Sequence, residues 1–274
     1  MFARLLSPVL LVCLMSGQGL AGPVRDLAAS MRFTQLFEVL QDEGLRFGES
    51  LQADLFPGEG GARWRRDVAR IHDAATMQEL AEADLEERLE NQPEALARMK
   101  AFFDSPTGQK ISDLEIAARR AYLDDRVKAA AERAWGNFGV DLPGRVVLIE
   151  TLVETNDLIE QNVAGGMNAN LAFYQGMRAA GAFGEDVPEP DMMADLWSQE
   201  DAIREETAGW LLPYLAMAYR PLSDAELSAY VAFSKSPDGQ LLNRALFATF
   251  DKVFVTVSRD LGTAAAGMLN GRDI

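Results

Sequence analysis

Residues 102–110 read Phe102-Phe103-Asp104-Ser105-Pro106-Thr107-Gly108-Gln109-Lys110, and residues 233–241 read Phe233-Ser234-Lys235-Ser236-Pro237-Asp238-Gly239-Gln240-Leu241. The two segments lie 131 positions apart and share Phe, Ser, Pro, Gly and Gln at equivalent places. A Ser before Pro is biased away from the helical region, so it ends the preceding helix. It also starts the next one, because its hydroxyl accepts a backbone N–H and Pro is already set to helical φ. Each segment therefore predicts a corner between two helices.

The shared residues have separate structural roles in such a corner. The Phe is expected to be buried where the helices cross, the Gly lets a neighbouring backbone approach closely, and the Gln ties the corner to a neighbouring helix. This predicted structural motif comprises Phe102, Ser105, Pro106, Gly108, Gln109, Phe233, Ser236, Pro237, Gly239 and Gln240. An anion site at the helix N-terminus is the alternative. Lys110 would help it in the first copy, but Leu241 replaces this Lys in the second.

The similarity extends beyond the two segments. Residues 96–117 match residues 227–248 at eight of 22 positions. An internal repeat of this kind predicts a structural unit that occurs twice. We expect two tandem helical units of four to five helices each, at 22–139 and 140–274, with Pro143 and Gly144 between them. The units form either two domains or one joint core.

Helical spacing of apolar residues recurs along the chain, and no stretch alternates with period two, so we predict an all-α fold. Ser223 and Glu226 have the spacing of a capping box, and Gly139 is expected to end a helix as its C′ residue. Pro, Gly and capping residues indicate where helices begin and end. They predict helices at about 24–55, 62–75, 77–90, 93–104, 106–138, 145–182, 191–205, 206–219, 223–235 and 237–268.

Residues 1–21 have the pattern of a secretory signal peptide. Arg4 precedes an apolar stretch from Leu5 to Met15, and small residues lead to a cleavage position after Ala21. The apolar stretch is about half of the ~20 residues that span a bilayer. An uncleaved anchor and a lipoprotein at Cys13 are the alternatives. We expect a periplasmic or secreted protein that begins at Gly22 and has no transmembrane span.

The residue content excludes several partners and sites. Cys13 is the only cysteine, so the mature chain has no disulfide framework and no thiolate site. The chain carries 26 Lys and Arg against 42 Asp and Glu, a formal net charge of −16. Binding to nucleic acid needs a concentrated basic surface, so we expect no nucleic-acid partner. An anionic membrane surface is disfavoured for the same reason. The acidity is expected to keep an exported protein soluble, with a cationic partner as the alternative.

The first segment, Phe102–Lys110, resembles the signature Phe-Tyr-x-Ser-Pro-x-Gly-Gln-Lys of an exported bacterial family that is catalogued as a domain of unknown function. The resemblance covers about residues 94–125. It implies an all-helical fold and export, and it supplies no activity and no catalytic residue. The second copy departs from the signature at Ser234 and Leu241, which indicates a diverged repeat.

No catalytic, cofactor-binding or metal-ligating residue is predicted. His72 is the only histidine, so a catalytic triad or a histidine metal cluster would be incomplete, and we expect His72 to be exposed on a helix. The chain has no glycine-rich phosphate loop followed by Lys and no Gly-x-Ser-x-Gly turn. The apolar run from Trp210 to Tyr219 is predicted to be a core helix, or else an exposed groove.

Carboxylates are the abundant reactive groups. They crowd two predicted helices as Glu79, Glu82, Asp84, Glu86, Glu87, Glu90 and as Glu150, Glu154, Asp157, Glu160. Helical spacing favours solvated acidic faces. Two carboxylates held close in a cleft would instead serve an envelope glycan hydrolase. Our leading expectation is a non-enzymatic periplasmic protein that binds an envelope protein or a small apolar ligand between its two units.

Overall fold

The computed structural model of the protein describes residues 22–182, 194, 197–198 and 200–271. Within these ranges the chain forms helices and no strand, which confirms the all-helical prediction. None of the helices in this part of the chain is long and apolar enough to cross a membrane. The predicted signal peptide and the loop with Pro188 and Pro190 lie outside the described residues.

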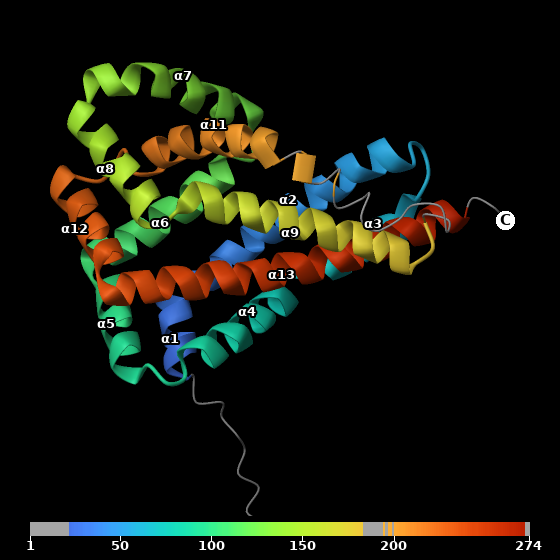
Figure 1. Ribbon diagram of the computed structural model, residues 1–274, viewed down its shortest axis with the longest axis horizontal. Helices are drawn as coiled ribbons and strands as arrows, with labels where there is room; N and C mark the ends of the chain where they lie inside the picture. Colours follow the sequence, from blue (N-terminus) through green and yellow to red (C-terminus); the bar gives the residue numbers. More distant parts are fainter. Residues whose placement is uncertain (1–21, 183–193, 195–196, 199, 272–274) are drawn as a thin grey trace, which may run out of the picture.

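The helices are packed as a bundle of unequal elements (Figure 1). In chain order they are α1 (Pro23–Ser30), α2 (Phe33–Leu55), α3 (Gly61–Ile71), α4 (Ala74–Leu89), α5 (Pro93–Asp104), α6 (Pro106–Ala121), α7 (Asp125–Asp141), α8 (Pro143–Thr155), α9 (Leu158–Ala179), α11 (Glu200–Ala218), α12 (Asp224–Lys235) and α13 (Pro237–Asn270).

Two predicted long helices, 24–55 and 145–182, are each broken in two. Arg32 and Asp157 adopt left-handed backbone conformations, with φ of 62° and 51°, directly before α2 and α9. They are the only non-glycine residues with positive φ in the described part of the chain. Such a conformation is unfavourable for a side chain with a Cβ, so tertiary packing must hold it, and residue type alone does not reveal it.

Three further helix boundaries differ from the prediction. The predicted helix at 106–138 ends at Ala121, and a second helix begins after Asp124, whose carboxylate accepts the Arg126 N–H. Gly139 lies inside α7 and is not a C′ residue. The predicted break at 205–206 is wrong, because α11 continues through it and also through Pro213. The predicted capping box of Ser223 and Glu226 is present and confirmed.

The buried apolar side chains form two main clusters that do not follow chain order. The first core, built on α1–α5, includes Leu27, Phe37, Trp64, Leu85 and Met99 and also takes Leu242, Val253 and Leu261 from α13. The second core, built on α7, α8, α11 and α12, includes Phe138, Ile149, Leu215 and Leu227 and also takes Ile111 and Ala118 from α6. The chain therefore passes from the first core to the second between α5 and α6, and returns between α12 and α13.

The chain crosses between the two cores at the two Ser-Pro corners. The serine hydroxyl makes the same two hydrogen bonds at each corner. Ser105 Oγ accepts the Gly108 N–H at 3.1 Å and donates to the Phe102 carbonyl at 2.6 Å. At the second corner Ser236 makes the equivalent bonds, at 3.0 and 2.6 Å. The hydroxyl therefore bonds to both helices at once, and this fixes the angle between them.

Glycine is required at the third position after the serine of each corner. A Cβ on Gly108 would lie 2.2 Å from the Phe102 carbonyl oxygen. A Cβ on Gly239 would lie 2.1 Å from the Phe233 carbonyl oxygen. Both obstacles are backbone atoms that cannot move without opening the corner.

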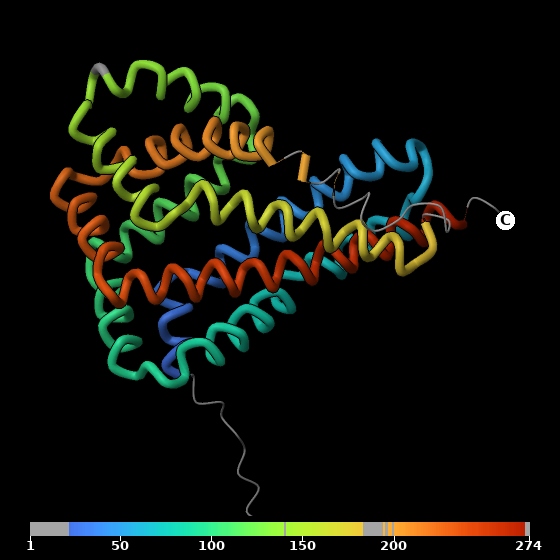
Figure 2. The backbone as a smooth tube through the Cα atoms, in the orientation of Figure 1, coloured from blue at the N-terminus to red at the C-terminus, as the bar shows by residue number. Residues whose placement is uncertain are grey.

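The two corners pack directly against each other. The Phe102 and Phe233 rings stack with centroids 4.0 Å apart and an interplanar angle of 6°. Both rings are partly buried, whereas the sequence predicted full burial. Ion pairs flank the stack, from Arg98 of α5 to Asp238 of α13 (2.6 Å) and from Lys110 of α6 to Glu226 of α12 (2.8 Å). The corners thus meet as one unit at the end of the molecule where α5 and α12 lie (Figure 2).

The corner glutamines reach a further helix in each case. Gln109 Nε2 donates to the carbonyl oxygen of Ser30, the last residue of α1, at 3.0 Å. Gln240 Nε2 donates to the carbonyl oxygen of Thr155, the last residue of α8, at 2.9 Å. Each glutamine therefore satisfies a carbonyl group at a helix end that precedes one of the left-handed residues.

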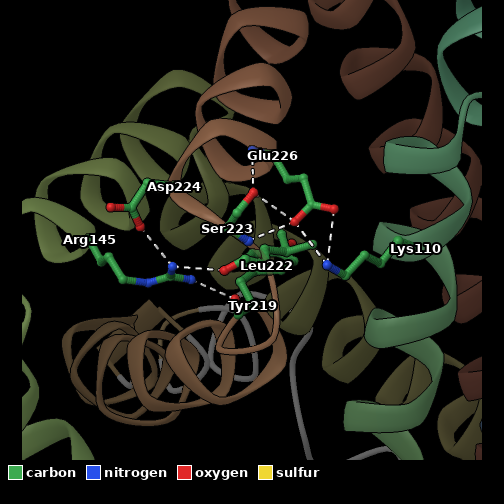
Figure 3. A network of polar contacts seen from close by, with 7 residues as sticks. All are labelled: Lys110, Arg145, Tyr219, Leu222, Ser223, Asp224 and Glu226. Carbon is green, nitrogen blue, oxygen red and sulfur yellow. Dashed lines mark hydrogen bonds and ion pairs between the residues drawn. The ribbon is translucent and has the colours of Figure 1, made fainter.

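Polar contacts hold the turn between α11 and α12 and the first turn of α12 in place (Figure 3). Arg145 of α8 is buried and donates to the carbonyls of Tyr219 (2.7 Å) and Leu222 (2.9 Å) in the turn between α11 and α12. The Lys110 ammonium, with the Ser223 N–H and hydroxyl, lowers the pKa of Glu226 to about 2. Glu226 is therefore ionised at any ordinary pH and keeps its bond to α6.

A buried carboxylate holds α13 on the first core. Asp84 of α4 accepts hydrogen bonds from Arg88 (2.5 Å), Thr249 (2.8 Å) and Lys252 (2.6 Å), the last two on α13. Burial alone would raise the pKa of Asp84, but these donors outweigh it and lower the pKa. A buried charge with several donors is compensated, so this contact secures the returning helix.

Replacing Gly108 by Ala is expected to destabilise the protein by about 1–3 kcal/mol, because the new Cβ collides with the backbone of α5. Gly239→Ala should have the same effect. Gly136→Ala is the matched control, since Gly136 is exposed within α7 and has no neighbour within 4 Å. The control should be neutral or gain up to about 1 kcal/mol in urea unfolding. Equal stabilities of the Gly108 and Gly136 variants would contradict the role of the corner.

Candidate functional site

A cavity of about 500 Å³ is lined by side chains of both cores. Met31 belongs to the first core, and Leu152, Leu211 and Leu215 belong to the second. The two crossing helices also contribute: α6 lines the cavity with four side chains, and α13 lines it with Asn243 and Phe247. The cavity therefore lies where α6 and α13 pass from one core to the other.

A second cavity of about 640 Å³ adjoins the first along α9 and α13, which lie side by side (Figure 1). The two share the lining residues Leu36, Arg119, Asn162 and Phe247. The second cavity is lined by Gly165 and Gly166 of α9, where no side chain fills the space. The two cavities are therefore direct neighbours, and most of the surface lining each is apolar.

Glu115 of α6 is the central polar group of the first cavity. Its Oε1 accepts hydrogen bonds from the hydroxyls of Tyr219 (2.6 Å) and Tyr230 (3.2 Å). The side chain is partly exposed where it lines the cavity, and protein atoms surround the rest of it. This burial raises the pKa of Glu115, and the two tyrosine hydroxyls offset the rise only in part.

The tyrosines around Glu115 are themselves held in place. Tyr214 donates to the Glu115 carbonyl oxygen at 3.1 Å, and Tyr122 donates to the Trp210 carbonyl oxygen at 3.3 Å. Burial, with the nearby Glu115 charge, raises the pKa of Tyr214, Tyr219 and Tyr230. These phenols stay protonated, so each acts as a fixed hydrogen-bond donor to the protein.

A second charged pair borders the same cavity. Arg119 of α6 binds Glu43 of α2 through Nε and Nη2, both at 2.8 Å. Burial alone would lower the pKa of Arg119, but the Glu43 carboxylate raises it. This bidentate ion pair has no net charge, and it fixes both side chains at the cavity wall.

Comparison with known proteins adds no assignment to this geometry. No protein family, curated protein or solved structure matches the chain. The resemblance to the exported family therefore stays a prediction from the sequence.

The residues singled out from the sequence mostly lie away from the cavity. None of the ten corner residues lines it. The helix run from Trp210 to Tyr219 does: Leu211, Leu215 and Tyr219 are buried, and together with Trp210 and Tyr214 they form one wall. The run is thus both a core helix and a cavity wall.

The acidic faces are exposed as predicted from helical spacing, with partly buried Glu82 and buried Asp84 as exceptions. None of their carboxylates lines the first cavity, although Glu160 borders a smaller one beside α9. In the part of the chain that the structure describes, no three His, Cys, Asp or Glu side chains gather closely enough to hold a metal ion.

The prediction that His72 is exposed is wrong. His72 is only 6% exposed, and its Nδ1 lies 3.0 Å from the Val68 carbonyl oxygen. The ring packs where Gly44 of α2 has no side chain, since a Cβ there would lie 2.0 Å from the imidazole. Burial lowers the pKa of His72, so the ring is neutral and belongs to the first core.

Sequence reasoning missed Glu43 and Glu115. The pattern around Glu115 contained a usable signal, because Ile111, Glu115, Ala118 and Tyr122 follow helical spacing on one face. A carboxylate on an otherwise apolar stripe indicates a buried polar site or a cavity. Its tyrosine partners lie more than 100 positions away, and their approach is a property of the folded chain.

Glu115→Gln is expected to stabilise the protein at neutral pH. The sign follows from proton binding: between its ordinary pKa of 4.5 and its higher folded pKa, Glu115 is protonated when folded and ionised when unfolded. Wild-type stability therefore falls as pH rises through this window, by at most about 1.4 kcal/mol per pH unit from this group. Urea unfolding of both proteins from pH 4 to 8 measures the difference. A difference that does not grow with pH would show that Glu115 is not buried.

Proposed function

We propose that this protein is a non-enzymatic, exported helical protein that binds a small apolar or amphipathic ligand in the cavity around Glu115. The observation that carries the proposal is the cavity itself, which is lined mainly by aromatic and aliphatic side chains with one central polar cluster. A volume of about 500 Å³ lies within the usual range for small-molecule sites, and so does this pattern of lining. Export rests on the predicted signal peptide at 1–21.

We also propose that the chain consists of two tandem helical units that have exchanged α6 and α13. The equivalent Ser-Pro corners, the Gln109 and Gln240 bonds to helix ends, and the left-handed Arg32 and Asp157 all support a duplicated plan. On this proposal α6 and α13 correspond, and each packs into the core of the other unit. The cavity between the cores would then be a product of the duplication.

An envelope protein is the other partner that the sequence suggested. A groove of about 670 Å³ between α7 and α11, lined by Trp135, Phe138 and Met217, is the surface that would suit it. The fixed polar centre around Glu115 favours a small ligand in the first cavity as the principal partner.

The proposal predicts that a neutral apolar dye such as N-phenyl-1-naphthylamine binds at one site per chain. Asn162→Trp should weaken its binding at least about tenfold, because the indole would fill the junction of the two cavities. Asn162 bonds only to a carbonyl of its own helix, so its loss should cost little stability. Fluorescence titration measures the affinities.

Asn170→Trp is the matched control. Asn170 is exposed on the same helix, α9, and lines neither cavity. It should leave dye binding unchanged. Wild-type protein that binds no dye, or equal binding by both variants, would contradict the assignment of the cavity.

A glycan hydrolase that uses paired carboxylates is the alternative function, and one observation favours it. Glu43 and Glu115 line one cavity from different helices, and the raised pKa of Glu115 suits a general acid. Against it, both oxygens of Glu43 are engaged by Arg119. The binding proposal expects no release of sugar from purified peptidoglycan. Hydrolysis by the wild type that disappears in both Glu43→Gln and Glu115→Gln would support the hydrolase instead.

A further inference from the structure

We propose that the cavity selects a ligand with a protonated amine on an apolar body, and that the amine binds the free oxygen of Glu115. The inference rests on the proposed function and names the chemical class of its ligand. It follows from which polar atoms of the cavity already form hydrogen bonds within the protein and which do not.

The tyrosine hydroxyl protons of the cavity are already committed to the protein. Tyr219 and Tyr230 donate to Glu115 Oε1, Tyr214 donates to the Glu115 carbonyl, and Tyr122 donates to the Trp210 carbonyl. Each hydroxyl has one proton, so these four groups have only acceptor capacity left for a ligand. A ligand that presents an acceptor finds no free proton on these four tyrosines.

The amide side chains of the cavity are less selective. Asn162 donates to the Leu158 carbonyl at 2.6 Å, and Asn243 donates to the Asn156 carbonyl at 3.0 Å. Their side-chain oxygens keep their acceptor capacity. Each amide also keeps one N–H, so the amides can serve a ligand donor or a ligand acceptor. The preference for a donor therefore rests on Glu115 and the tyrosines.

Glu115 Oε2 is the strongest of these acceptors. Both tyrosine hydroxyls bond to Oε1, and no donor among the described residues bonds to Oε2. Among the described residues, Arg145 Nε is the one buried side-chain nitrogen or oxygen atom without a hydrogen-bond partner. Glu115 Oε2 also has no partner among these residues, so it is not buried and is accessible from the cavity. An ammonium N–H that reaches Oε2 would form a charge-assisted hydrogen bond in a poorly solvated site.

The aromatic lining suits a cation as well. Four of the five tyrosines of the chain, namely Tyr122, Tyr214, Tyr219 and Tyr230, line this cavity together with Trp210. The faces of such rings attract cations, most strongly where water is excluded. A hydrocarbon chain on the amine would then extend along the apolar second cavity.

The basic groups at the cavity wall do not oppose this choice. The Arg119 charge is balanced by Glu43, and Lys128 is exposed and lies 3.3 Å from Asp125. The formal net charge of −16 further favours the approach of a cation. Burial disfavours an unpaired carboxylate, and an arriving ammonium would favour the ionised form of Glu115.

The test compares three ligands of equal length, octylamine, 1-octanol and octanoate, by calorimetric titration at physiological ionic strength. Wild-type protein should bind octylamine at least about tenfold more tightly than octanol, with octanoate weakest. Glu115→Gln should bind octylamine and octanol with similar affinities. Asp113→Asn removes an exposed carboxylate of the same helix that does not line the cavity, and it should keep the preference for the amine.

The outcomes separate the inference from the proposed function. Equal binding of octylamine and octanol by the wild type, or a preference that Glu115→Gln retains, would overturn the amine inference and leave the apolar site standing. Tightest binding of octanoate would overturn it in favour of Arg119 as the recognising group. Binding of none of the three would reject the ligand site altogether.

Discussion

The contact between the two Ser-Pro corners is the constraint on which the rest of the structure depends. At each corner a glycine N–H meets the serine hydroxyl, and the backbone of the preceding helix lies where a Cβ would be. The stacked rings of Phe102 and Phe233 then hold the corners together, and offset aromatic pairs add stability beyond their buried area. Because both chain crossings occur here, a change at either corner affects both cores.

The crossing explains why a cavity with a polar centre persists between two packed cores. Side chains in one core collapse onto each other, but α6 and α13 belong to different cores and are fixed at their N-termini by the corners. Their inward faces meet aromatic side chains from α11 and α12, which cannot fill the space completely. Keeping the Glu115 carboxyl in such a place costs stability at neutral pH, and functional sites often carry a cost of this kind.

Local rules predicted a large part of this fold. Helical spacing, the Ser-Pro caps and the capping box of Ser223 depend on neighbours in sequence, and all are present in the described residues. The breaks at Arg32 and Asp157 were missed because packing against other helices imposes their left-handed conformation. The exchange of α6 and α13 was missed for a related reason, since an amphipathic helix does not specify which core it enters. The burial of His72 depends on the absent side chain at Gly44, a residue of another helix.

The most direct test of the account is the ionisation of Glu115 in solution, followed through its carboxyl carbon by NMR in protein labelled at glutamate. We expect the titration midpoint to lie above the ordinary value of 4.5 in the free protein, because the carboxyl is buried. Saturation with octylamine should lower it, because the ammonium stabilises the carboxylate. A midpoint at or below 4.5 that octylamine does not move would contradict both the buried carboxyl and the site built around it.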